Sequence, residues 1–322
     1  MGTSRTVAVV GLRTSAVGGW RSDVSVTASA IRDHPVLLLV GVIGFALRGG
    51  IVLLTVPILI LPTQVEVRLA LGGNLGSTGL TGGFFVIVGA LSILAFALGL
   101  LCLYTLARCE LAAFTRFVNH AERGEQLARP TPGRVDAPTR RTATVRIFVV
   151  ESLALLAILM AAVPLAAAIG DATLSEILLP SSTGSIYGRI LGRVTAPLVG
   201  FVVALVLVEG ISAVAVRAVL AQPFGLARHA GVLRRPLRKI AVAVVGWALF
   251  IGALAVGLLA LAPTWDVVRA VFLSRGLSGD IRDIASAMVV ALLFGAVYAA
   301  ALLLCGLVSA FRSGLWTFAS LR

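Results

Sequence analysis

The chain alternates between long apolar runs and shorter polar segments. An α-helix needs about 20 residues to cross the hydrocarbon core of a bilayer, and six of the runs reach that length. A polar stretch separates each run from the next. The pattern therefore predicts an all-α polytopic membrane protein, a bundle of six transmembrane helices. The predicted spans are residues 36–61, 83–107, 147–169, 195–216, 240–262 and 285–311.

The polar segments differ in basic content, and the difference predicts the direction of the spans. Twenty Lys and Arg residues lie in the N-terminal segment, residues 108–146, residues 217–239 and the C-terminal tail, whereas six lie in the three other loops. Cytoplasmic segments are enriched in basic residues. Both termini are therefore predicted to be cytoplasmic, in a multi-pass protein of the cell membrane.

Composition supports a membrane environment and changes how the net charge is interpreted. The chain is 59% hydrophobic and 13% charged, with a formal charge of +13. In a soluble protein this charge would favour nucleic acid, but here the basic residues lie in short segments between the spans. We therefore expect the lipid bilayer and anionic headgroups at the cytoplasmic face as partners, and no nucleic acid.

The loops on the two sides differ in kind. The predicted outer loops hold short amphipathic stretches, which we expect to lie as interfacial helices on the outer surface. Among the inner segments, residues 121–145 are rich in proline and arginine and are predicted to be a cytoplasmic linker. The amphipathic stretches read QVEVRLAL, ATLSEILL, SIYGRILGRV and WDVVRAVFL.

A weak internal repeat suggests how the spans are grouped. The exits of the first and fifth spans, LPTQVEVRLA and APTWDVVRAV, align Arg68 with Arg269, and the second, fourth and sixth spans end in similar sequences at Arg116, Arg217 and Arg312. Repeats of this kind are common in transporters. They predict a single membrane domain over residues 1–322 built from three hairpins. The hairpins cover residues 1–120, 146–230 and 231–322, with the linker after the first.

The first span differs from the others because it carries a charge. Small residues mark helix faces that contact other helices in membranes, and Arg48 follows Gly41 and Gly44 on the same face. About 13 residues, or roughly 19 Å, separate it from Pro35, which predicts a position near the bilayer centre. A charge there requires a partner or water. A break in the helix is predicted beside it, at Gly49, Gly50 and Pro57.

Three acidic residues are candidate partners for Arg48 in a buried polar cluster. Glu209 in the fourth span has the best-matched depth, whereas Glu151 and Glu110 lie closer to the cytoplasmic boundary. An Arg48–Glu209 pair would either lock two helices together or form part of a polar pocket open to the cytoplasm. The sequence is compatible with both arrangements.

The function classes can be ranked but not resolved. Neither a catalytic or nucleotide motif nor a cysteine or histidine spacing typical of metal sites stands out, so no cofactor or metal is predicted. A transporter or the permease subunit of a transport complex ranks first, and an ATP-driven version would need an ATPase partner subunit. A non-catalytic scaffold or assembly factor ranks second. A membrane-embedded enzyme acting on lipid ranks last, because its carboxylate pair would lack a supporting motif.

Overall fold

The computed structural model describes residues 20–55, 75–76, 79–80, 82–123, 137–178, 186–222, 236–275 and 281–321. Within these ranges, six helical segments are long and apolar enough to cross a membrane. The predicted all-α fold with six such helices is therefore confirmed. The elements are α1 (Trp20–Asp33), α2 (Val36–Phe45), the π-helical turn η1 (Ala46–Gly50), α3 (Ile51–Thr55), β1 (Leu75–Gly76), β2 (Gly79–Leu80), α5 (Gly82–Arg123), α6 (Ala137–Leu178), α7 (Ile186–Ala221), α8 (Pro236–Arg275) and α9 (Ile281–Leu321).

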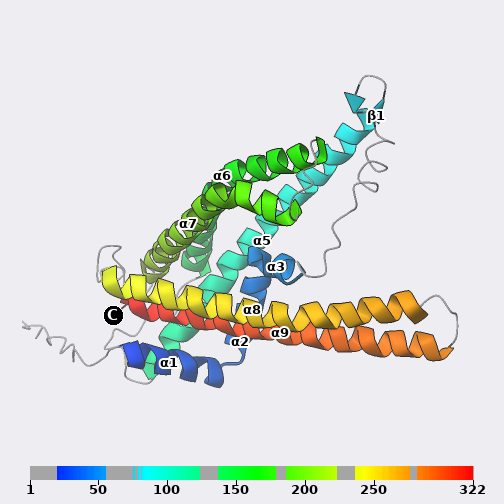
Figure 1. Ribbon diagram of the computed structural model, residues 1–322. Coiled ribbons are helices and arrows are strands. Elements are labelled where there is room, and N and C mark those ends of the chain that lie inside the picture. The colour runs from blue at the N-terminus through cyan, green and yellow to red at the C-terminus, as the bar shows by residue number, and fades with distance from the viewer. Residues whose placement is uncertain are drawn as a thin grey trace, which may run out of the picture.

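The long helices form two arms that meet at one end of the molecule (Figure 1). One arm contains α6 and α7, packed along each other, together with α5, and the other contains α8 and α9. The arms converge close to the C-terminus and diverge toward the start of α7 and the start of α9. The first span, formed by α2, η1 and α3, lies between them and packs more on α9 than on α5.

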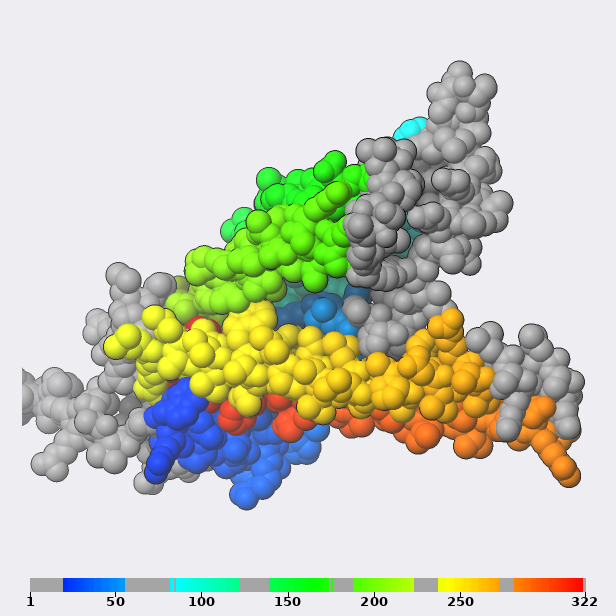
Figure 2. Space-filling model, viewed as in Figure 1, coloured from blue at the N-terminus to red at the C-terminus, as the bar shows by residue number. Residues whose placement is uncertain are grey.

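The space between the arms, here called the wedge, is visible as a hollow in the surface (Figure 2). Atoms of the first span, in blue, lie at its floor between the green α6/α7 arm and the yellow α8. The buried residues gather mostly at the convergent end, where α5, α6, α7 and α9 pack around Phe114, Phe117 and Leu315. The fold is thus closed at the convergent end, where its core lies, and splayed at the other.

A belt of exposed apolar side chains marks where α5 and α7 would contact lipid. On α5 the belt runs from Phe85 to Tyr104, and on α7 it runs from Leu191 to Ile211. At 1.5 Å per residue these stretches are about 28–30 Å long, which matches the hydrocarbon thickness of a bilayer. The convergent end of both helices extends beyond this belt.

Several predicted loop features belong to the long helices. Three of the amphipathic stretches fall wholly or mostly within the last turns of α6, the first turns of α7 and the last turns of α8, so they extend the spans and form no separate helices. The linker predicted at 121–145 is partly helical, because α5 ends at Arg123 and α6 begins at Ala137. The stretch QVEVRLAL and the repeat partner Arg68 lie outside the described residues.

The hydropathy pattern predicts no element for residues 20–33, where the structure has α1. This helix is amphipathic, and it buries Val26, Thr27 and Ala30 against α5 and α9 at the convergent end. Asp23 is also buried and forms an ion pair with Arg238 at the start of α8. A helix that covers the end of a bundle needs only one apolar face, so it leaves no long apolar run in the sequence.

Candidate functional site: a charge cluster where the arms meet

The first span changes course at Arg48. The backbone there leaves the helical region, with φ −82° and ψ 15° at Arg48 and φ 87° and ψ 10° at Gly49. A positive φ is readily adopted by glycine and costs other residues free energy, because their Cβ approaches the backbone. The resulting π-helical turn separates α2 from α3. Pro57, the third residue of the predicted break, lies outside the described residues.

A Gly49→Ala variant tests this turn, and we expect it to lower the free energy of unfolding by about 1 kcal/mol. A Cβ at Gly49 would meet no atom within 4 Å, so only the backbone strain would be measured. Gly252→Ala in the interior of α8 is the matched control, since it also meets nothing within 4 Å but has no positive φ. The control should be neutral or slightly stabilising. Thermal unfolding of the purified proteins in detergent would compare the two, and equal midpoints would contradict the expectation.

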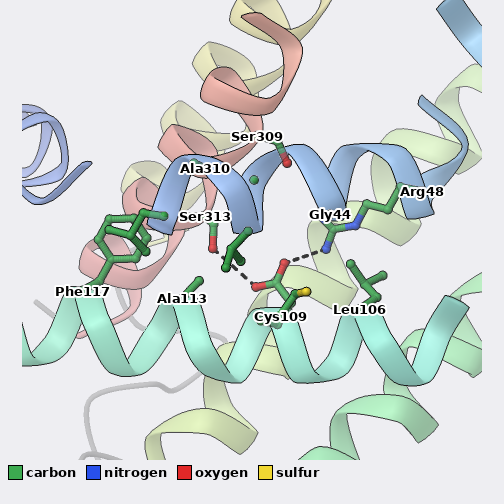
Figure 3. Close-up of a pocket in the computed structure, with 13 residues that line it drawn as sticks. Gly44, Arg48, Leu106, Cys109, Ala113, Phe117, Ser309, Ala310 and Ser313 are labelled. Atoms are coloured by element: carbon green, nitrogen blue, oxygen red, sulfur yellow. Dashed lines mark hydrogen bonds and ion pairs between the residues drawn. The ribbon is translucent and has the colours of Figure 1, made fainter. Parts of the chain in front are cut away.

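The side chain of Arg48 reaches from this turn back toward α5 (Figure 3). Its Nη2 atom donates to Glu110 Oε1 at 2.8 Å and to Glu151 Oε1 on α6 at 3.5 Å. Glu110 and Glu151 are nearly buried, with side chains 8% and 13% exposed, whereas Arg48 is 44% exposed. Arg48 therefore links the first span to α5 and α6 of the neighbouring arm.

Glu110 is held from its other side by Arg217 of α7. Arg217 Nη1 donates to Glu110 Oε2 at 2.8 Å, and its Nη2 donates to the hydroxyl of Ser313 on α9 at 2.9 Å. Arg217 has a side chain that is only 4% exposed. A buried carboxylate between two guanidinium groups is compensated on both oxygens, which is the condition under which a charge is tolerated away from water. Through Ser313 these contacts also reach the second arm.

Glu209 pairs with Arg312 of α9. The guanidinium of Arg312 also lies 5.4 Å from the ring centroids of Trp247 and Phe250 on α8, a cation–π distance. The sequence favours Glu209 as the partner of Arg48, but the structure bonds Glu209 to Arg312. Glu209 is nevertheless close enough to act electrostatically on Arg48. The Arg312–Glu209 pair joins α7 of one arm to α9 of the other.

These contacts form one balanced group, here called the charge cluster. Three arginines and three glutamates give it no net charge, and it connects the first span with α5, α6, α7 and α9. In a low-dielectric site a balanced set is far cheaper to maintain than an unpaired ion. The members are Arg48, Glu110, Glu151, Glu209, Arg217 and Arg312.

A cavity of about 20 Å³ borders the charge cluster between α2, α5 and α9. Arg48, Glu110, Ser309 and Ser313 contribute polar groups to its lining, while Phe117 lies toward the convergent end (Figure 3). This volume holds about one water molecule. Between α2, α5 and α9 the site is therefore closed to anything larger than a water molecule.

The charge cluster lies at one edge of the exposed apolar belt. On α5, Glu110 follows Tyr104, the last large exposed apolar residue, by six positions, about 9 Å along the helix. The guanidinium of Arg48 is at the depth of Glu110, because its side chain points back along α2 toward the convergent end (Figure 3). Relative to the belt, the guanidinium of Arg48 is thus near the predicted cytoplasmic boundary. Counting residues from Pro35 instead places it near the bilayer centre.

Sequence reasoning did not include two members of the charge cluster. Arg217 and Arg312 end the fourth and sixth apolar runs, and charges at such positions ordinarily mark the membrane boundary. Their similar positions at the ends of even-numbered spans are the one signal that sets them apart. The third residue of that set, Arg116, bonds to the backbone carbonyl of Ala112 within its own helix.

The fold and the charge cluster define a multi-pass α-helical membrane protein. Comparisons of the chain with protein-family models, with curated proteins and with solved structures found no match.

Proposed function

We propose that the protein is a transporter, or the permease subunit of a transport complex, of the cell membrane. The observation that carries this proposal is the position of the charge cluster, which joins both arms at their convergent end, while the described helices of the two arms diverge beyond it. Alternating access requires a protein with one side closed by breakable contacts and the other side open. Ion pairs between helices, next to a broken helix, meet that requirement.

In this proposal both termini face the cytoplasm and the charge cluster is the inner closure. The closure is made of side-chain contacts and leaves a cavity the size of a water molecule, so opening it requires the arms to move. An ATP-driven version would dock an ATPase subunit on the cytoplasmic side. A scaffold would need the same ion pairs but no movement of the arms. Movement of the arms therefore distinguishes a transporter from a scaffold.

A spin-label measurement tests for this motion. Labels on cysteines at Val199 of α7 and Leu292 of α9, both exposed, would report the separation of the arms, with Cys102, Cys109 and Cys305 replaced by alanine. In lipid nanodiscs we expect two distance populations. We also expect Glu209→Gln to shift them toward the shorter distance, because it weakens the ion pair that holds the convergent end closed.

The matched control places both labels in one arm, at Leu259 of α8 and Leu292 of α9. These helices pack along each other, so their distance should be single and should not respond to Glu209→Gln. A single inter-arm distance that the variant leaves unchanged would contradict transport and favour the scaffold.

A further inference from the structure

The two most exposed members of the charge cluster both have unused hydrogen-bonding atoms. Arg48 makes both of its bonds through Nη2, so Nε and Nη1 are without a hydrogen bond to the described residues. Glu209 bonds to Arg312 through Oε1, and its Oε2 atom accepts no hydrogen bond within the same part of the chain. Their side chains are 44% and 33% exposed, so these atoms are accessible.

These two residues lie where the arms begin to separate. Arg48 is on the first span between the arms, and Glu209 is on α7 at its junction with α9. The free Nε–H and Nη1–H groups of Arg48 suit an oxyanion such as a phosphate, to which each can donate a charge-assisted hydrogen bond. A free carboxylate oxygen suits an ammonium group. The site thus offers one binding group of each sign.

Charge balance selects a ligand that carries both signs. The charge cluster is neutral, and in a medium of low dielectric constant an added anion would leave one uncompensated negative charge. A zwitterion adds no net charge and satisfies both free groups. The site is therefore complementary to a headgroup that contains a phosphate and an ammonium.

The surroundings indicate that this headgroup belongs to a lipid. The charge cluster lies about 9 Å beyond the exposed apolar belt on α5, at the depth of lipid headgroups. From there the first span, which forms the floor of the wedge, continues from Arg48 into exposed apolar side chains at Ile51, Val52 and Leu53. A soluble zwitterion would gain nothing from this apolar surface, whereas acyl chains would bury their own surface against it.

We propose that the wedge binds a phospholipid whose headgroup carries a phosphate and a primary ammonium, with the phosphate on Arg48 and the ammonium on Glu209. The acyl chains lie between the arms. This assignment rests on the proposed transport function and gives it a substrate class, an aminophospholipid of the leaflet next to the charge cluster. A primary ammonium can donate a hydrogen bond to Glu209 Oε2, and a quaternary one cannot.

Native mass spectrometry of the full chain tests the assignment. The protein in detergent would be mixed with equimolar phosphatidylethanolamine, phosphatidylcholine and phosphatidylglycerol, and the lipid retained in the gas phase would be counted. We expect phosphatidylethanolamine to be retained preferentially. Arg48→Lys keeps the charge but replaces the guanidinium, whose Nε and Nη1 are unused, by a single ammonium that must also serve Glu110 and Glu151, and it should weaken retention of this lipid roughly tenfold.

Glu209→Gln separates recognition from folding. It should remove the preference, so that phosphatidylethanolamine and phosphatidylcholine are both retained and to the same extent, whereas a general loss of structure would abolish retention of both. Asp33→Asn, which removes a charge from an exposed side chain, is the matched control and should keep the preference. If Arg48→Lys cannot be purified, the ratio of the two lipids in Glu209→Gln decides.

Three results would overturn the assignment. They are retention without selectivity, selectivity that Glu209→Gln leaves intact, and displacement of the lipid by free phosphoethanolamine at equal concentration, which would indicate a soluble zwitterion. The spin-label experiment tests transport separately from lipid selectivity, so each proposal can be contradicted without the other. Two arm distances without lipid selectivity would leave transport with another substrate, and selectivity with one arm distance would leave a lipid-binding scaffold.

Discussion

Glu110→Ala should destabilise the protein by about 3–5 kcal/mol, the largest effect expected of a single side chain in this fold. Glu110 is 8% exposed and accepts hydrogen bonds from both Arg48 and Arg217. Removing it leaves two guanidinium groups facing each other, one of them buried, with only a serine and a more distant carboxylate as partners. Unfolding in a denaturing detergent, monitored by circular dichroism, would measure the loss.

A surface ion pair provides the control for Glu110→Ala. Arg32 and Asp33 form a contact of 3.3 Å with side chains 81% and 46% exposed, and such pairs contribute at most about 1 kcal/mol. Asp33→Ala should therefore change the stability little. A loss below 1 kcal/mol for Glu110→Ala would contradict the view that the charge cluster is buried and closed.

The double variant Glu110→Ala/Arg217→Ala tests whether these charges act as a unit. Once Glu110 is absent, removing Arg217 also removes the uncompensated buried charge that makes the single variant unstable. The double variant should therefore lose at least about 1 kcal/mol less than the sum of the single losses. Strict additivity would show that the two side chains do not interact energetically.

The spans could be predicted from the sequence because their signal is local. Six apolar runs of sufficient length correspond to six long helices, and nothing about their packing is needed to find them. By the same logic the hydropathy pattern misses α1, whose single apolar face only becomes meaningful once α5 and α9 are in place beneath it.

The partner choice within the charge cluster could not be predicted, because it depends on how helices are rotated and paired. Axial depth makes Glu209 a reasonable partner for Arg48, and the two do interact electrostatically. However, depth does not reveal that Arg312 of α9 faces the same carboxylate. The first span also packs mainly on α9, a helix more than 200 residues away in sequence, and this pairing decides which charges meet.

The depth of Arg48 in the bilayer differs from the predicted depth for a related reason. Counting residues from Pro35 assumes that the first span begins at the membrane boundary. In the structure α2 packs beside Ala113, Phe117 and Phe318, which lie beyond the exposed belt toward the convergent end. The arginine side chain then points back along the helix, as side chains on helices do, and this brings the charge to the edge of the belt.

The close packing of α2 on α9 gives the second large expected effect, a loss of about 2–3 kcal/mol for Gly41→Ala. A Cβ at Gly41 would lie 2.3 Å from the carbonyl oxygen of Gly306 and 2.7 Å from Cβ of Ala310. The nearest atom belongs to the backbone, so no rotamer change can relieve the overlap and the helices must separate. Because Gly41 lies seven residues before Arg48, this separation would also disturb the charge cluster.

Gly44→Ala is the matched control, because it adds the same methyl group to the same helix one turn away. Its Cβ would meet only Cδ1 of Leu106, at an ordinary contact distance of 3.9 Å, so its stability should stay within about 1 kcal/mol of the parent protein. Thermal unfolding in detergent would compare both variants with the parent protein. If the two alanines had the same effect, the backbone contact between α2 and α9 would be absent in the membrane protein. The first span would then be free to leave α9, and the charge cluster could not close the convergent end through it.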